Sequence, residues 1–517
     1  MDPEEFRKHG KEMIDYVADY WSTIRDRKPL PDIKPGYLSQ LVPSHPPSAP
    51  EDWSAIFADL ESVVLQGVTN WHHPNFHAYF PTALSYQAIM GDILSGGISA
   101  IGFTWKSCPS MTELEMTTLD WLVESLGLPE HFKNSAEGPG CGIIQSTASD
   151  ATHIAIMTAR AKAVENVKTS EASGLLGRLA ASDVGKTVKN LLARVRQNTI
   201  EEKDSDLILP HFHDPTVFEK LVAYCSDQAH SSVEKGVMLC GVRLRKLKST
   251  RDEKGNFTVT VEDFEKAIKE DVSKGLIPFI MIATMGTTNS CSFDHLEQLG
   301  PICKREHIWL HCDAAYAGSF LLCPEFRYMS TGIEYCDSFN FNAHKGMLIN
   351  FDCSPMWFAD GTNAARYFTV DPLYLKHEHQ AVASDYRHLQ IALGRRFRSL
   401  KIWFVLRNIG VEALQNHLKK QNQQAVQFSD YIESSDEFEL FAPQHLGLVC
   451  FRIKDSTDED NEALCNAINE DRRIHLVPSK VHGKFFLRLA VCSQLTTSED
   501  IRTAYEVIRE IHLTLKK

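Results

Sequence analysis

The sequence predicts an α/β protein with a large, mostly parallel sheet, an N-terminal helical arm and a smaller C-terminal α+β domain. From about residue 86, helix-like segments alternate with apolar runs such as 277–284 and 307–312, a pattern typical of buried parallel strands. Residues 4–25 have the apolar spacing of an amphipathic helix, and prolines follow over 29–50. Beyond about residue 400, a helical pattern over 411–434, two strand-like segments and a last helix over 498–514 indicate the smaller domain.

These patterns give the expected domain boundaries. We expect the arm over residues 1–85, the large domain over 86–400 and the small domain over 401–517. The arm has little core of its own, so it should pack on the body or on a second subunit.

The composition indicates a globular protein of the cytoplasm. The 517 residues are 43% hydrophobic, enough for a large core. A formal net charge of −13 without a long basic run argues against nucleic acid or an anionic membrane as the main partner. No apolar stretch reaches the roughly 18–20 residues of a membrane span, and the acidic start resembles no targeting signal. Thirteen scattered cysteines favour reduced thiols.

The segment between about 163 and 217 is the least regular part of the sequence. Residues 185–187 (GKT) resemble the end of a phosphate-binding loop, but Ala180 stands where its first glycine belongs and no strand precedes it. His211 and His213 with Asp214 could bind a metal ion. Two histidines flanking one phenylalanine are more often loop residues, so we expect no metal site.

Asp313 and Lys345 are the main candidates for chemistry. Asp313 follows a buried apolar run, and Lys345 ends another strand-like segment, 337–345 (DSFNFNAHK). A lysine and an aspartate at the ends of neighbouring strands suit pyridoxal phosphate (PLP), because the lysine binds the cofactor as a Schiff base and the aspartate keeps the pyridine nitrogen protonated. For an arbitrary Asp–Lys pair, an ion pair at a sheet edge is the commoner explanation. The neighbouring motifs therefore decide between an ion pair and a PLP site.

A second motif supplies a candidate phosphate site. Residues 138–150 (GPGCGIIQSTASD) precede a helical pattern over 151–161, and Thr147, Ala148 and Ser149 would present backbone N–H groups and hydroxyls to a phosphate at the helix start. Such residues also simply cap helices. Four further residues are expected beside the same cofactor: His230, whose ring could stack on it, Thr288, Asn342 and His344.

Many segments resemble the group II PLP-dependent decarboxylases, most closely the animal aromatic-L-amino-acid (DOPA) decarboxylases. The similarity runs nearly from end to end, and only about 40 residues within 163–217 look inserted. The segments that carry it include 77–82 (HAYFPT), 226–235 (SDQAHSSVEK), 313–318 (DAAYAG), 371–377 (DPLYLKH) and 394–401 (GRRFRSLK).

The resemblance implies a fold, an assembly and residue roles. The fold would be the PLP-dependent transferase fold type I (aspartate-aminotransferase-like), in a homodimer with shared active sites. Lys345 would be the Schiff-base lysine, Asp313 the partner of the pyridine nitrogen, and Tyr374 the proton donor, assisted by His230. The remaining cofactor contacts would be Thr147, Ala148, Ser149, Ser338 and Asn342 at the phosphate, Ala315 on the ring face opposite His230, and Thr288 near the ring. The substrate side would comprise Trp71, Tyr79, Phe80, Thr82, His344 and Gly394, joined by Ile101 and Phe103 of the second subunit.

The implied reaction is decarboxylation of an aromatic L-amino acid, such as DOPA or 5-hydroxytryptophan, to the arylalkylamine and CO2, as in catecholamine and other neurotransmitter biosynthesis. His230 and the order Tyr79–Phe80 favour this over the aldehyde-forming relatives, which typically carry Asn at the first position. Gly394 favours a large ring, since histidine-specific relatives tend to carry Ser there. An aromatic acetaldehyde synthase, a histidine- or tyrosine-selective decarboxylase and a catalytically impaired paralogue remain alternatives. A transaminase would need an arginine clamp.

Several residues depart from the family pattern around the expected site. Gly346 stands where relatives have Trp or Met, and we expect it to remove contacts beside Lys345 and loosen that lysine. The other departures are Cys141 within a glycine triplet, Pro355 where a small residue is usual, and Leu389 and Ala392 in place of Trp and Pro.

Overall fold

The large domain is built on a seven-stranded sheet. A computed structural model describes residues 1–180, 212–370, 372–379 and 384–516. The strands are parallel except for β9, which runs antiparallel to both of its neighbours. Their order across the sheet is β1 (Cys141–Gln145), β9 (Ser354–Phe358), β8 (Ser338–Asn340), β7 (Trp309–Asp313), β6 (Ile277–Thr284), β2 (Leu221–Ser226) and β3 (Arg243–Leu247).

Both faces of this sheet are buried, which explains the continuous apolar runs. Along β6, Ile280 and Ile282 pack into one cluster and Met281 and Ala283 into another, as the alternation of side chains along a strand requires. The first cluster is completed by α5 (Ala148–Ala180) and α8 (Ser231–Leu239). The second is completed by α4 (Pro109–Leu126), α9 (Val261–Ser273), α10 (Leu296–Arg305) and α14 (Val411–Glu433).

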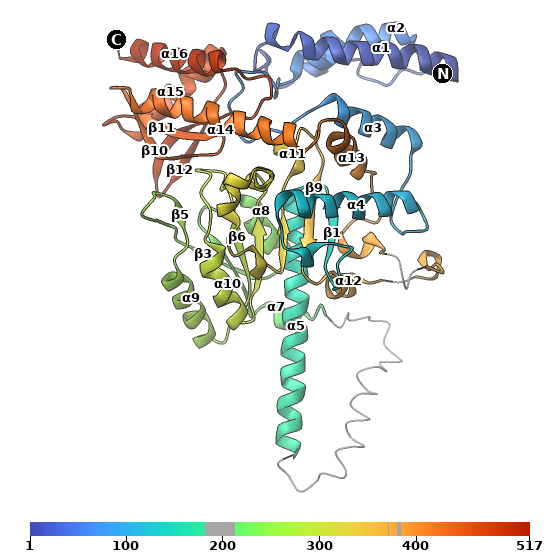
Figure 1. The fold of residues 1–517 in the computed structure, drawn as a ribbon. Helices are drawn as coiled ribbons and strands as arrows, with labels where there is room; N and C mark the ends of the chain where they lie inside the picture. Colours follow the sequence, from blue (N-terminus) through green and yellow to red (C-terminus); the bar gives the residue numbers. More distant parts are fainter. Residues whose placement is uncertain (181–211, 371, 380–383, 517) are drawn as a thin grey trace.

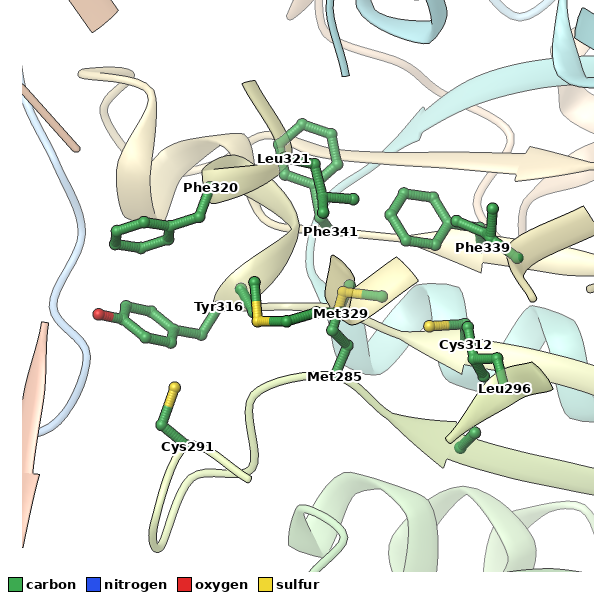
Figure 2. Close-up of a cluster of buried hydrophobic side chains, with 14 of the residues drawn as sticks. Met285, Cys291, Leu296, Cys312, Tyr316, Phe320, Leu321, Met329, Phe339 and Phe341 are labelled. Carbon is green, nitrogen blue, oxygen red and sulfur yellow. The ribbon is translucent and has the colours of Figure 1, made fainter. Parts of the chain in front are cut away.

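The second cluster contains the segment that follows β7. Figure 2 shows Tyr316 and Phe320 from this segment side by side, with ring centroids 5.5 Å apart, above Cys291. Phe339, on the neighbouring strand β8, and Phe341 just beyond it continue the same apolar layer. The residues after Asp313 are therefore held by the core.

The C-terminal part is a second, smaller α+β unit. Its core is formed largely by Phe428, Phe438 and Phe451, with aliphatic residues of the helices around them. The antiparallel strands, in spatial order, are β10 (Phe438–His445), β11 (Leu448–Ile453), β13 (Lys484–Ala490) and β12 (Val477–Val481). Helices α14, α15 (Asp458–Asp471) and α16 (Ser498–Leu515) accompany them. The domain boundaries themselves stay a prediction.

The N-terminal arm is helical and lies at one end of the molecule. Helices α1 (Pro3–Ser22) and α2 (Trp53–Asp59) lie side by side there, and α3 (Tyr86–Ile98) follows below them (Figure 1). Helix α1 buries none of its residues in this chain. Tyr16 packs edge-on against Phe57 at 5.4 Å, and the Arg25 guanidinium pairs with the Asp500 carboxylate of α16 at 2.9 Å.

Most of the predicted elements are confirmed, with local corrections. The predicted helices at 4–25, 411–434 and 498–514 correspond to α1, α14 and α16, and both named apolar runs form strands. Lys345 does not end a strand, because β8 stops at Asn340 and the lysine lies on the short helix α11 (Ala343–Gly346). Thr288, predicted beside the cofactor, lies in the turn beyond β6, which ends at Thr284.

The irregular segment near 163–217 begins as a continuation of α5, which projects from the body (Figure 1). Residues 185–187 and His211 lie outside the described residues. His213 donates from Nε2 to the Tyr367 carbonyl at 2.8 Å, and the Asp214 carboxylate accepts the Thr216 N–H at the start of α7 (Pro215–Phe218). In the described ranges, no three His, Cys, Asp or Glu side chains are grouped for a metal ion.

Pro355 lies within β9, and the residue before it in the same strand compensates for its missing N–H. Phe341 donates its N–H to the Pro355 carbonyl at 3.1 Å, but proline has no N–H to return. The Ser354 hydroxyl instead donates to the Phe341 carbonyl at 3.2 Å. The ladder therefore stays satisfied at this position. Across the described ranges, no helix has the length and apolar character needed to span a bilayer.

Candidate active site

A cavity of about 170 Å³ lies at the carboxyl ends of β6 and β7 and the N-terminal end of α5. This is where α/β sheets usually bind ligands. It brings together eleven of the residues predicted for the site: Phe80, Thr147, Ala148, Ser149, His230, Thr288, Asp313, Ala315, Asn342, His344 and Lys345.

Asp313 is a buried carboxylate held by the backbone. It ends β7 with 3% of its surface exposed, and Ala315 donates its N–H to Oδ1 at 3.0 Å. Burial raises the pKa of Asp313, while the Ala315 N–H, Lys345 and His230 act in the opposite direction. A cationic partner inside the cavity would therefore be strongly favoured by this carboxylate.

Lys345 faces the same cavity. Burial lowers the pKa of its ammonium, and the Asp313 carboxylate partly opposes that shift. Its Nζ lies 5.9 Å from the centroid of the Phe80 ring. A neutral amine is the nucleophilic form, so this environment prepares Lys345 to bond to a carbonyl carbon.

His230 is fixed by the helix that it caps. The Ser232 N–H donates to its Nδ1 at 3.2 Å, and the Ser232 hydroxyl lies 2.9 Å from the same nitrogen. Burial, with a contribution from Lys345, lowers the pKa of His230, so the ring is neutral near pH 7. Because Nδ1 accepts the backbone N–H, the proton of the neutral ring lies on Nε2.

The start of α5 suits an anionic group, and unpartnered polar atoms in the cavity suit a ligand that forms hydrogen bonds. Ala148 and Ser149 open α5, where the first backbone N–H groups have no partner inside the helix. Thr147 accepts the Asp150 N–H at 3.2 Å, which holds this turn in place. Two buried oxygens of the cavity, Asn342 Oδ1 and Thr284 Oγ1, have no hydrogen-bond partner in the described structure.

These residues fit PLP. A helix N-terminus suits the phosphate, a buried carboxylate suits the ring nitrogen, and a buried amine suits the aldehyde carbon. The fold and the site thus define a PLP-dependent enzyme of the α/β, fold type I class.

Comparisons with known proteins agree with this class. The family described as the pyridoxal-dependent decarboxylase conserved domain matches residues 35–189 and 182–454. An aromatic-L-amino-acid decarboxylase of Drosophila melanogaster is 47% identical over 508 residues, which cover 98% of this chain and 91% of that protein. The crystal structure of Oryza sativa TDC with PLP and tryptamine superposes with a TM-score of 0.87 at 30% identity, covering 100% and 99% of the two chains. Rhodiola rosea 4-hydroxyphenylacetaldehyde synthase gives 0.84 at 30% identity, with 99% of both chains covered.

The chain therefore belongs to the pyridoxal-dependent decarboxylase family, and its cofactor is PLP.

Several predicted site residues lie outside the cavity. Ser338 lies farthest from the predicted arrangement: its hydroxyl is buried at the start of β8, where it accepts from Trp309 Nε1 and contacts His311 Nδ1, both at 2.8 Å. It is not available to a phosphate at the far end of the sheet. Tyr374 lies in a short 3-10 turn with 81% of its surface exposed. The other predicted residues that do not line the cavity are Trp71, Tyr79, Thr82, Ile101, Phe103 and Gly394.

Trp71 and Tyr79 form a separate aromatic surface. Their rings stack at 5.4 Å, and Phe76 packs against Trp71 at 5.1 Å. Ile101 is 54% exposed and is the nearest neighbour of Gly394, since a Cβ on that glycine would lie 3.7 Å from its Cγ2. These two predicted residues share one outer surface.

Five cavity residues were not predicted. Tyr316 stacks on Phe80 with centroids 3.6 Å apart and is the most important of them. It belongs to the segment 313–318, so its position in that motif was the available signal. The others are Ser232, Thr284, Gly286 and Phe351. Ser232 and Thr284 have simple signals, as they lie two residues after His230 and at the end of an apolar run.

Gly346 leaves no open space, contrary to the sequence-based expectation. A Cβ there would lie 2.6 Å from Ser319 Cβ, 2.9 Å from Ser319 Oγ and 3.2 Å from Leu418 Cδ2. Neighbouring side chains therefore already fill the volume beside Lys345. Cys141 is similarly enclosed, because its Sγ occupies the place of a Cβ on Gly361. The exposed Ala392 has no interpretation in the structure beyond its loop.

Proposed function

We propose that this protein decarboxylates aromatic L-amino acids to arylalkylamines and CO2. The observation that carries the proposal is the polarity of the cavity. Among its lining residues, all in the described part of the chain, there is no arginine, and Lys345 is the one lysine. An arginine would hold the substrate carboxylate as an ion pair, whereas a neutral histidine can orient it and still let it depart as CO2. The names of the relatives support the aromatic substrate.

The protein's own groups would each have a distinct task. Bound PLP supplies a ring that withdraws the electrons left at Cα when the carboxylate departs. Asp313 would hold a proton at the ring nitrogen, and burial keeps that interaction strong. Lys345 would hold the cofactor and give way to the substrate amine. His230 offers Nε2–H towards the carboxylate side and limits water at the cofactor face.

An aromatic side chain has a suitable surface in this chain. Phe80, backed by Tyr316, forms an apolar wall of the cavity, and the Trp71–Tyr79 stack lies in the same N-terminal segment. Aromatic pairs of this kind favour an aromatic ligand ring.

Tyr374 remains the proposed donor of the proton that Cα receives. Its ring does not line the cavity of this chain, so the proposal requires that residues 372–379 approach a cavity in the working enzyme. Tyr374→Phe should reduce turnover at least tenfold and leave PLP affinity unchanged. Equal turnover by the variant would remove Tyr374 from the mechanism.

We also infer that two copies share their active sites. Helix α3 exposes the apolar residues Tyr86, Met90, Ile93 and Leu94, and Ile101 lies just beyond it. Such a contiguous apolar surface is typical of an interface. Ile101→Asp should yield monomers in sedimentation analysis and lower activity. An active monomer would contradict shared sites.

A cytoplasmic location is proposed because all thirteen cysteines are free thiols.

A substrate panel tests the function. Purified holoenzyme with DOPA, 5-hydroxytryptophan, tyrosine, phenylalanine or histidine should release CO2 and one equivalent of amine from at least one aromatic substrate. Lys345→Ala is the inactive control. Stoichiometric hydrogen peroxide and aldehyde would instead identify an aromatic acetaldehyde synthase, the alternative favoured by the similarity to the Rhodiola rosea protein. Preference for histidine would contradict the role of Gly394.

A further inference from the structure

Arg488 is a buried cation close to the site, and no described residue pairs with its charge. It lies on β13, where it pairs with Cys450 of β11, and only 3% of its surface is exposed. Its Nε donates to the Asn289 carbonyl at 3.2 Å, but its Nη2 has no partner in the described structure. Within those residues it forms no ion pair, and its nearest titratable neighbours are thiols and the Tyr316 phenol. Keeping an unpaired guanidinium buried is costly, so its retention calls for a reason.

Its contact with Phe80 connects Arg488 to the cavity. The guanidinium carbon lies 5.1 Å from the centroid of the Phe80 ring, and Lys345 Nζ lies 5.9 Å from the same centroid. Phe80 lines the cavity and Arg488 does not. One aromatic ring, stacked on Tyr316, therefore has both an arginine and the proposed Schiff-base lysine as cationic neighbours.

We infer that Arg488 is a positioning residue with two effects: its contact with Phe80 fixes that ring in the cavity wall, and its charge keeps the Lys345 amine in the form that bonds to the cofactor. The inference rests on the proposed role of Lys345 and is independent of which substrate is used. The cation–π contact orders Phe80, and the positive charge disfavours a second charge on Lys345.

The charges around Lys345 determine the size of this effect. Asp313 on β7 favours the ammonium, as does the thiol of Cys492, whereas Arg488 disfavours it. His230 and His344 also neighbour the lysine, and both have lowered pKa values, about 4 for His344, so they are neutral near pH 7. Arg488 is thus the permanent positive charge that opposes protonation. The guanidinium carbon and Lys345 Nζ lie 5.1 Å and 5.9 Å from one ring centroid, so they are close enough for Arg488 to lower the pKa of Lys345.

The test is capture of PLP by apoprotein as a function of pH, without substrate. Schiff-base formation is followed by visible absorbance and by the fraction trapped with borohydride. Arg488→Met should move the midpoint up by roughly one pH unit, so capture below the midpoint falls about tenfold. Arg488→Lys restores the charge and should restore the midpoint. An unchanged midpoint in a folded Arg488→Met protein, or no restoration by lysine, overturns the inference.

Phe80→Leu is the second variant, and it should shift the pH midpoint of PLP capture in the direction opposite to Arg488→Met. It removes the ring that stabilises a protonated Lys345 and leaves Arg488 in place, so the midpoint should fall. This result remains decisive if Arg488→Met does not fold, and an upward shift would overturn the inference. Because no substrate is present, loss of decarboxylation cannot be confused with loss of this effect. Failure of all variants and of the unmodified protein to capture PLP would instead contradict the role of Lys345.

Discussion

Gly346→Ala tests whether the volume beside Lys345 is already filled. The added Cβ would approach Ser319 Cβ to 2.6 Å and Leu418 Cδ2 to 3.2 Å. Both neighbours lie on packed elements, so they cannot simply turn away. Overpacking of this kind costs about 1–3 kcal/mol, which for a large domain lowers Tm by roughly 2–6 °C. Thermal unfolding of the apoprotein measures it, and PLP affinity reports any displacement of the lysine.

Two further variants make this prediction specific. Gly10→Ala in α1 adds a methyl group where nothing lies within 4 Å, so it should not destabilise the protein. Ser319→Gly removes the Cβ and Oγ that clash, and that Oγ has no hydrogen-bond partner to lose. The double variant should therefore recover at least half of the loss seen in Gly346→Ala. Unchanged stability of Gly346→Ala, or no recovery in the double variant, would refute the reasoning.

Three other perturbations have definite expectations. Ser354→Ala should lower the free energy of unfolding by about 1–2 kcal/mol in denaturant titrations, because it leaves the Phe341 carbonyl unpaired beside Pro355; an unaffected midpoint would show that another donor replaces the hydroxyl. Ser146 precedes Thr147 of the candidate phosphate site, and its hydroxyl accepts from the Arg398 guanidinium at 3.0 Å. Arg398→Met frees Ser146 and should weaken PLP binding about three- to tenfold. Equal affinity in a fluorescence titration would contradict this. Burial lowers the pKa of His311 to about 4, below its value in the unfolded chain. The contribution of His311 to the free energy of unfolding is therefore full above about pH 6.5 and falls by up to about 3 kcal/mol towards pH 4. His311→Asn should flatten that decline.

The sequence predicted the chemistry of the site better than its geometry. Asp313 and His230 were recognisable because a motif of fixed spacing accompanies each, and both line the cavity. A motif shows which residues occur together and not at which end of a strand a side chain lies; the Ser338 hydroxyl, predicted at the phosphate, contacts Trp309 and His311. Lys345 lines the cavity, but it lies on a helix and not at a strand end; that helix has four residues, too few for periodicity to reveal it.

Arg488 could not have been predicted from sequence patterns at all. It lies 143 positions beyond Lys345 (488 − 345), in a strand of the other domain, and nothing in its neighbourhood forms a motif. Its importance comes from the lack of a counterion among the described residues, and that can be seen only once the side chains are placed.

The departures from the family pattern favour an intact active site over an impaired one. If Gly346 had left a void, the lysine would have lost its support; instead Ser319 and Leu418 occupy that space. At Pro355, the Phe341 carbonyl would have lacked a donor; instead the Ser354 hydroxyl supplies one. At Gly346 and Pro355, a neighbour thus restores volume or hydrogen bonding. Such matching preserves the positions of Asp313 and Lys345, which a site without function would not require.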